Sequence, residues 1–228
     1  MRRPVQAELF KTRGGKRPGA GRRVEPGGRA GVSHKARERF AKPTPVHATV
    51  RIARGVWNLR ARRCRSLIEG ALSALRQREG FRVIEFSIQG NHVHLVVEAD
   101  NSVALSRGMQ SLSIRVARAL NRLMERTGKV FEDHFHSRTL NNPSEVANAI
   151  GYLLTNQEHH FGNTGLDSCS SFALDAARRA ELLPGPVTWV LRGGWRKAKG
   201  LEKRPWLQLL GRNEAAPWPH LSASQATR

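Results

Sequence analysis

The sequence predicts an α+β fold, a ferredoxin-like split βαβ sandwich with one antiparallel sheet and both helices on the same face. Two observations predict it. Strand-like and helix-like stretches follow in the order strand, helix, strand, strand, helix, strand, and the tight-turn signal Gly90-Asn91 joins the second strand to the third. In this topology the first and third strands are central neighbours, so the third strand has an open face that can hold a site. A C-terminal helix carrying the only tyrosine of the chain follows the sheet.

Four stretches alternate between apolar and polar residues and are rich in β-branched side chains, as half-buried strands require. They cover residues 45–52, 81–89, 92–99 and 129–140. The first opens the folded part of the chain, and the second and third form a hairpin. The fourth is expected at the sheet edge, beside the first strand.

Helices are predicted where apolar residues recur at spacings of three and four. The first covers residues 59–78 and is stopped by Gly80, and the second covers 102–126, with Gly128 past its end. A short helix is expected over 174–183, in a region that is otherwise hard to interpret.

The helix after the sheet has a strong start signal. Asn142 caps it, Pro143 takes the first helical position, and Glu145 supplies the acid of a capping box. Beside its apolar stripe runs a polar face, on which Tyr152 and Asn156 stand four residues apart. These two side chains are therefore expected to project together.

The composition points to a polyanionic partner. The chain has 39 Lys and Arg against 18 Asp and Glu, a formal net charge of +21, which favours nucleic acid. No stretch reaches the roughly 18 to 20 apolar residues of a membrane span, and no signal peptide is recognisable. Cys64 and Cys169 form no pair motif, so a reducing, cytoplasmic protein without disulfides or a cysteine-based zinc site is expected.

The chain divides into three parts. Residues 1–43 are rich in Gly, Pro and Arg and are interpreted as a disordered basic arm that touches phosphates or only solubilises the chain. Residues 44–162 form the predicted folded domain. Residues 163–228 form a basic extension of unknown role, whose spread tryptophans suit either base stacking in single-stranded nucleic acid or a tail that folds back and buries them.

The third strand carries the most informative pair of residues. His92 and His94 stand one residue apart, so on a strand both imidazoles point to the same face, while Val93 points to the other. Such a pair is often just two polar residues facing solvent. It is also a metal-ligand arrangement, because it offers two neutral nitrogens side by side.

Together with one carboxamide oxygen, His92 and His94 would suit Mg²⁺ or Mn²⁺ and leave positions for water and phosphate oxygens. A metal there would polarise a scissile phosphodiester. The phenol of Tyr152, with an ordinary pKa of about 10, needs such help to act as a nucleophile at neutral pH. The alternative for Tyr152 is a core residue whose hydroxyl meets water.

At this point the motifs resemble a known family, the single-tyrosine HUH transposases (His, hydrophobic residue, His), most closely the REP-associated tyrosine transposases of bacteria. The motifs are Gly90-Asn-His-Val-His-Leu, Gly108-Met-Gln, Gly128-Lys-Val-Phe-Glu-Asp-His-Phe-His-Ser-Arg, and finally Tyr152 with Asn156. The resemblance covers about residues 45–161 and makes residues 44–162 the expected catalytic domain.

The resemblance implies an endonuclease that nicks and rejoins single-stranded DNA at a hairpin, a REP-like palindrome, through a 5′-phosphotyrosine. It implies that His92 and His94 are metal ligands, that Tyr152 is the nucleophile and that Asn156 is the third ligand. Many insertion-sequence members have Gln four residues after the tyrosine, whereas here Asn156 holds that position and Gln157 follows. Gln157 therefore remains the alternative third ligand.

Several polar residues are candidates for a supporting role or a DNA contact. They are Gln110, His136, and the arginine stripe Arg115, Arg118 and Arg122 on the second helix. A plain helix-surface position is an equal alternative for Gln110, and a solvated face is an equal alternative for the arginines.

Two other functions remain open. A catalytically inactive or domesticated relative would bind DNA hairpins without cutting them. A zinc or iron hydrolase would use His92, His94 and His136. The chain could be a monomer or a homodimer, and the short linker between Leu140 and Asn142 favours a site completed within one chain.

Overall fold

A computed structural model describes residues 37–162 and 165–211. Most of the basic arm expected over 1–43 lies outside the described residues, as do Trp218 and the rest of the chain after residue 211. Within the described part, no helix is long and apolar enough to cross a membrane.

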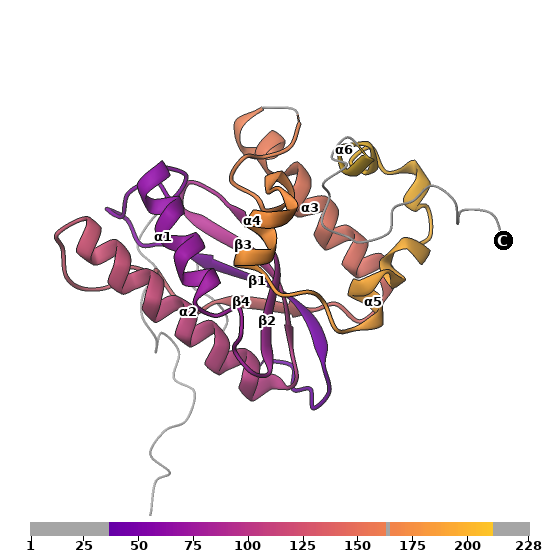
Figure 1. Ribbon diagram of the computed structural model, residues 1–228, viewed down its shortest axis with the longest axis horizontal. Helices are drawn as coiled ribbons and strands as arrows, with labels where there is room; N and C mark the ends of the chain where they lie inside the picture. The colour runs from indigo at the N-terminus through magenta and orange to yellow at the C-terminus, as the bar shows by residue number, and fades with distance from the viewer. Residues whose placement is uncertain (1–36, 163–164, 212–228) are drawn as a thin grey trace, which may run out of the picture. The chain divides into compact units, whose positions relative to one another are not determined.

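Four antiparallel strands form one sheet in the order β2-β3-β1-β4, which is the split βαβ topology (Figure 1). The strands are β1 (Thr44–Arg51), β2 (Phe81–Ile88), β3 (His92–Ala99) and β4 (His136–Thr139). The two central strands pair along their whole length, with Thr49 opposite His94 and Arg51 opposite His92. The predicted α+β sandwich is confirmed, including the central place of the histidine strand.

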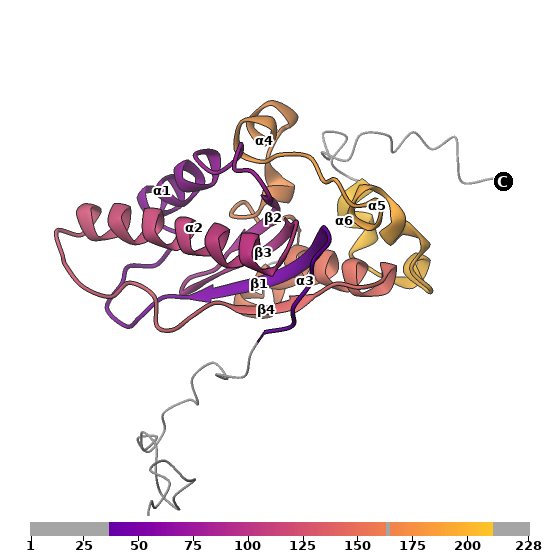
Figure 2. The same ribbon diagram turned by 90° about the horizontal axis from the view of Figure 1, so that it is seen from below.

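Helices α1 (Arg62–Ser73) and α2 (Ser102–Leu123) cover one face of the sheet (Figure 2). The alternation of the strands sends their apolar side chains to this face. From β3 these are Val93, Leu95, Val97 and Ala99, all of them buried. Gly108 of α2 lets the helix approach closely, because a Cβ there would lie 2.1 Å from the Phe81 ring.

Two predicted elements prove too long. The first helix spans Arg62–Ser73 rather than 59–78. After its end the chain continues in tighter turns, whose hydrogen bonds run to the third residue back. The fourth strand spans only His136–Thr139 rather than 129–140. In the preceding loop, Phe131 makes one isolated bridge to Ile52 before the chain bends.

The opposite face of the sheet is also covered, by α3 (Pro143–Phe161) and the C-terminal extension. The extension contains α4 (Ala176–Leu182), α5 (Trp189–Arg192), α6 (Leu207–Gly211) and short 3-10 turns. Ile84 and Val96 of the sheet are buried in this second core together with Trp195 and Trp206. Of the two roles considered for the tryptophans, the fold-back role therefore holds for Trp195 and Trp206, whereas Trp189 is 60% exposed.

Buried carboxylates fasten the extension to the sheet. Glu85 of β2 is fully buried and pairs with Arg179 of α4 at 2.6 Å. Glu98 of β3, also fully buried, accepts hydrogen bonds from the backbone N–H groups of Val187 and Thr188 at the start of α5. Because each buried charge has charged or N–H partners, the extension is bound in one defined position on β2 and β3.

Candidate active site

The histidine pair lies on the face of β3 that meets α3. The His92 and His94 rings are perpendicular to each other, with centroids 4.6 Å apart. His94 is buried and His92 is half-buried. The pair therefore has one member inside the protein and one at the rim.

Each of the two rings has a hydrogen bond at its Nδ1 atom. Nδ1 of His92 lies 2.8 Å from the amide oxygen of Asn91, and Nδ1 of His94 lies 3.0 Å from the hydroxyl of Thr49. A carboxamide oxygen only accepts, so Nδ1 of His92 carries the proton and its lone pair lies on Nε2. The Thr49 hydroxyl allows the same tautomer for His94, which is how metal-ligating histidines are usually oriented.

Tyr152 comes to the pair from α3. Its helix begins as the capping signal predicts, since Asn142 accepts from the Glu145 N–H at 3.0 Å. The Tyr152 hydroxyl lies 3.5 Å from Nε2 of His94, and the two rings meet edge to face with centroids 4.9 Å apart. Tyr152 is 40% exposed, so solvent and substrate can reach a phenol that stands beside a buried imidazole.

A third histidine joins this group. His47 of β1 has its ring centroid 5.4 Å from His94 and 5.8 Å from Tyr152. Its Nε2 is buried and has no hydrogen-bond partner. Burial first, and then the charges of His136 and Arg138, lower the pKa of His47 from 6.5 to about 4.

From the sequence, His47 is expected on a strand that could neighbour the site, but no role follows for it. His47 stands two residues before Thr49, so on a strand both side chains share a face. Since β1 and β3 are neighbours, that face continues into the one that carries His94. The alternation of side chains along β1, together with the predicted strand order, therefore indicates that His47 lies near His94.

The two candidate third ligands have different surroundings. Asn156 is fully buried, and neither its amide oxygen nor its amide nitrogen has a hydrogen-bond partner. Gln157 is half-buried, and its amide oxygen accepts from Arg60 at 3.4 Å. Tyr152 and Asn156 share one side of α3, but only Tyr152 reaches the surface.

The supporting candidates are distributed over both faces of the sheet. His136 lies on β4, paired with Thr49, exposed and close enough to His47 to affect its pKa. Gln110 lines a cavity of about 430 Å³ with Phe131 and Phe135, on the α2 side, away from Tyr152. The stripe Arg115, Arg118 and Arg122 is exposed on α2.

A group of three His, Cys, Asp or Glu side chains arranged to hold a metal does not occur within residues 37–162 and 165–211. His92, His94 and His136 are therefore not gathered into the three-histidine site that the hydrolase alternative requires. A third ligand to the histidine pair would have to come from another residue type, such as a carboxamide.

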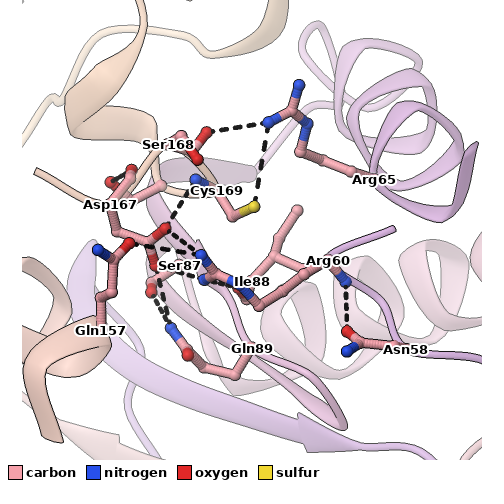
Figure 3. A network of polar contacts seen from close by, with 11 residues as sticks. Asn58, Arg60, Arg65, Ser87, Ile88, Gln89, Gln157, Asp167, Ser168 and Cys169 are labelled. Carbon is pink, nitrogen blue, oxygen red and sulfur yellow. Dashed lines mark hydrogen bonds and ion pairs between the residues drawn. The ribbon is translucent and has the colours of Figure 1, made fainter. Parts of the chain in front are cut away.

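Arg60 connects the loop before α1 to both the tyrosine helix and the extension (Figure 3). It donates to both carboxylate oxygens of Asp167, at 2.7 and 2.9 Å, and to the Ile88 carbonyl at 3.1 Å. Asp167 is fully buried and also accepts from the Cys169 N–H at 2.8 Å. The Arg60 side chain that contacts Gln157 is thus fixed by a bidentate ion pair with a buried carboxylate.

The structure is a split βαβ protein in which the sheet presents paired histidines to a tyrosine from the helix that follows. Residues 53–153 match the family model described as "Transposase IS200 like". Residues 53–153 are therefore similar to IS200-like transposases, and the resemblance seen in the motifs is confirmed.

Two solved structures are similar to this chain. One is a REP-associated tyrosine transposase bound to a REP hairpin, with 15% identity, a TM-score of 0.52, and coverage of 69% of this chain and 94% of that one. The other is a candidate transposase from Deinococcus radiodurans, with 14% identity, a TM-score of 0.38, and coverage of 55% and 98%. The first supports the fold. No curated protein sequence matches the chain.

Proposed function

We propose that this protein is a metal-dependent transposase that nicks and rejoins single-stranded DNA beside a hairpin through a 5′-phosphotyrosine. The observation that carries the proposal is the 3.5 Å approach of the Tyr152 hydroxyl to Nε2 of His94. These residues are 58 positions apart, and an accessible phenol beside paired imidazoles has the parts that phosphoryl transfer to tyrosine requires.

The donor set fits Mg²⁺ or Mn²⁺. His92 and His94 offer imidazole nitrogens oriented through their Nδ1 atoms, and the orphaned amide of Asn156 offers an oxygen. Gln157 is the weaker third ligand, because Arg60 already holds its amide oxygen. When bound, the ion supplies positive charge that stabilises the phenolate and the developing charge on the phosphate.

In the proposed step the oxygen of Tyr152 loses its proton and attacks phosphorus. A tyrosine–phosphorus bond forms while the bond from phosphorus to the DNA 3′-oxygen breaks, and the 3′-oxygen takes up a proton. The products are a 5′-phosphotyrosine and a free 3′-hydroxyl. Since one phosphodiester replaces another, a 3′-hydroxyl can reverse the step without a nucleotide energy source.

A DNA hairpin is the proposed partner. One solved transposase of this fold is bound to a REP hairpin, and the net charge of +21 favours a polyanion. The exposed arginines of α2, Arg115, Arg118 and Arg122, are proposed to contact its phosphates. In this arrangement the helices hold the hairpin, and the other face of the sheet carries the chemistry.

The test uses a labelled single strand containing the inverted repeat that flanks the gene, with Mn²⁺ and purified protein. We expect a denaturation-resistant protein–DNA band that Tyr152→Phe and His94→Ala both abolish. Tyr152→Phe should still bind the hairpin, because it loses only a hydroxyl. His134→Ala, an exposed histidine on the α2 side, is the matched control and should retain the band.

The same experiment distinguishes a transposase from a relative that binds DNA hairpins without cutting them. A band that survives Tyr152→Phe would rule out Tyr152 as the nucleophile. Hairpin binding that persists in EDTA, with no band from the wild-type protein under any metal, would leave a DNA-hairpin-binding protein without nuclease activity.

A further inference from the structure

The loop after β1, residues 53–60, presents a tryptophan to solvent. Trp57 is 46% exposed, although it is among the largest apolar side chains. A single exposed aromatic residue is ordinary on a protein surface, so exposure alone decides nothing. Trp57 differs from other exposed aromatic residues because its loop contacts both halves of the candidate active site.

On the histidine side, the loop is tied to the turn that leads into β3. The Leu59 N–H donates to the Gly90 carbonyl, and the Ile52 N–H donates to the Asn91 carbonyl, both at 2.9 Å. The Asn58 side chain packs against Gly90, where a Cβ would lie 3.6 Å from its amide oxygen. His92 follows this turn directly, and its Nδ1 bonds to Asn91.

On the tyrosine side, the loop reaches α3 through Arg60. Its guanidinium lies 3.4 Å from the amide oxygen of Gln157, five residues after Tyr152 in the same helix. The bidentate pair with the buried Asp167 prevents Arg60 from moving away (Figure 3). Trp57 therefore stands on a loop that is held to the histidine turn at both ends and joined to the tyrosine helix through Arg60.

The surroundings of Trp57 are basic. Arg54, Arg62 and Arg63 are exposed on the same stretch of chain, and the loop contains no acidic residue. An aromatic ring among arginines is the arrangement by which proteins hold single-stranded nucleic acid: the ring stacks on a base and the cations contact the backbone.

We propose that Trp57 stacks on a nucleobase of the single strand next to the scissile phosphate and so sets the position of that phosphate between His92 and Tyr152. This inference rests on the proposed transposase function and adds the residue that binds the flanking nucleotide. Stacking tolerates all four bases, so Trp57 sets the register of the strand more than the sequence that is cleaved.

The test scans the single strand with abasic nucleotides. The strand is joined to the flanking hairpin, so that hairpin binding fixes the position of each nucleotide on the protein. One nucleotide at a time is replaced by an abasic residue, and binding is measured for the wild-type protein and Trp57→Ala. We expect wild-type binding to weaken about tenfold or more at one or two adjacent positions near the cleavage site. Trp57→Ala should bind the intact strand this weakly and be insensitive to the same abasic positions.

Trp57→Phe should retain about the wild-type pattern, because a phenyl ring also stacks. Trp189→Ala removes another exposed tryptophan, on α5, and should keep the full abasic response. The proposal is overturned if Trp57→Ala leaves binding unchanged, or if it weakens binding while keeping the wild-type abasic pattern. Thermal unfolding of each variant identifies loss of fold.

The two proposals fail separately. A covalent Tyr152 adduct with no coupling between Trp57 and any base would retain the transposase and reject the stacking site. Position-specific coupling without any adduct would retain the stacking site and reject the nuclease.

Discussion

Asn156 is a polar residue that the core alone does not explain. Its side chain is fully buried with both amide atoms unpartnered, an arrangement that costs about 1–3 kcal/mol. Asn156 lies one turn after Tyr152, so a role of its amide in the reaction would explain why this destabilising arrangement is kept.

Asn156→Leu, which keeps the branching at Cγ, should therefore raise the free energy of unfolding by about 1–3 kcal/mol while abolishing the covalent adduct. Urea unfolding and the adduct assay measure the two effects. Gln157→Leu is the neighbouring control and should lower the adduct yield much less. A destabilised Asn156→Leu with normal activity would contradict a role for Asn156 in catalysis.

His47 predicts a pH dependence of stability. Its pKa is about 4 in the folded protein, against 6.5 ordinarily, so below pH 6.5 the unfolded chain binds the proton more tightly. The groups that face His47 are His94, Tyr152, His136 and Arg138, and none of these is a carboxylate that could raise its pKa again. Stability should fall as pH drops from 6.5 to 4, by up to about 3 kcal/mol, and the effect should level off below pH 4.

Urea unfolding at pH 7 and pH 5 measures this dependence. His47→Gln lacks the titrating ring, so the difference between the two pH values should shrink by about 2 kcal/mol in this variant. An equal pH response in both proteins would show that His47 titrates normally in the folded state.

At the scale of elements, α3 is held between the sheet and the extension. Gly151, next to Tyr152, lets the extension approach, because a Cβ there would lie 2.2 Å from Nε1 of the Trp206 indole. Arg204 adds a hydrogen bond to Asn148 on the same helix at 2.6 Å. The position of Tyr152 therefore depends on residues outside the family match, which ends at residue 153.

Gly151→Ala should lower the free energy of unfolding by about 1–2 kcal/mol, because overpacking outweighs the better helix propensity of Ala. Gly70→Ala is the matched control: it lies in α1 with nothing within 4 Å of the new Cβ, and it should stabilise the protein by about 0.5–1 kcal/mol. In a Trp206→Ala background, Gly151→Ala should become neutral or stabilising. Thermal or urea unfolding of these four variants and the wild-type protein measures these differences.

On the whole molecule, the arginine stripe of α2 and the candidate active site lie on different faces of the sheet. The arginine stripe is on α2, whereas Tyr152 reaches the sheet from the opposite side. Replacing Arg115, Arg118 and Arg122 together by Gln should reduce the slope of log affinity against log salt by about 2 to 3 for a hairpin stem. A saturating concentration of DNA should restore the adduct. An unchanged slope would show that this stripe is only a solvated face.

The topology and both halves of the candidate site can be predicted from the amino-acid sequence alone. Period-two alternation locates His92 and His94 on one face, because side chains of a strand alternate strictly. Helical spacing locates Tyr152 on a polar face beside an apolar stripe. These signals are local and need no knowledge of distant contacts.

Other features of the site could not be predicted, because they depend on how distant parts of the chain pack. Asn156 and Gln157 are told apart because Arg60 reaches only one of them, and the extension covers α3 because its buried charges find partners on β2 and β3. Each of these depends on pairings between residues tens of positions apart, for which the chain carries no periodic signal.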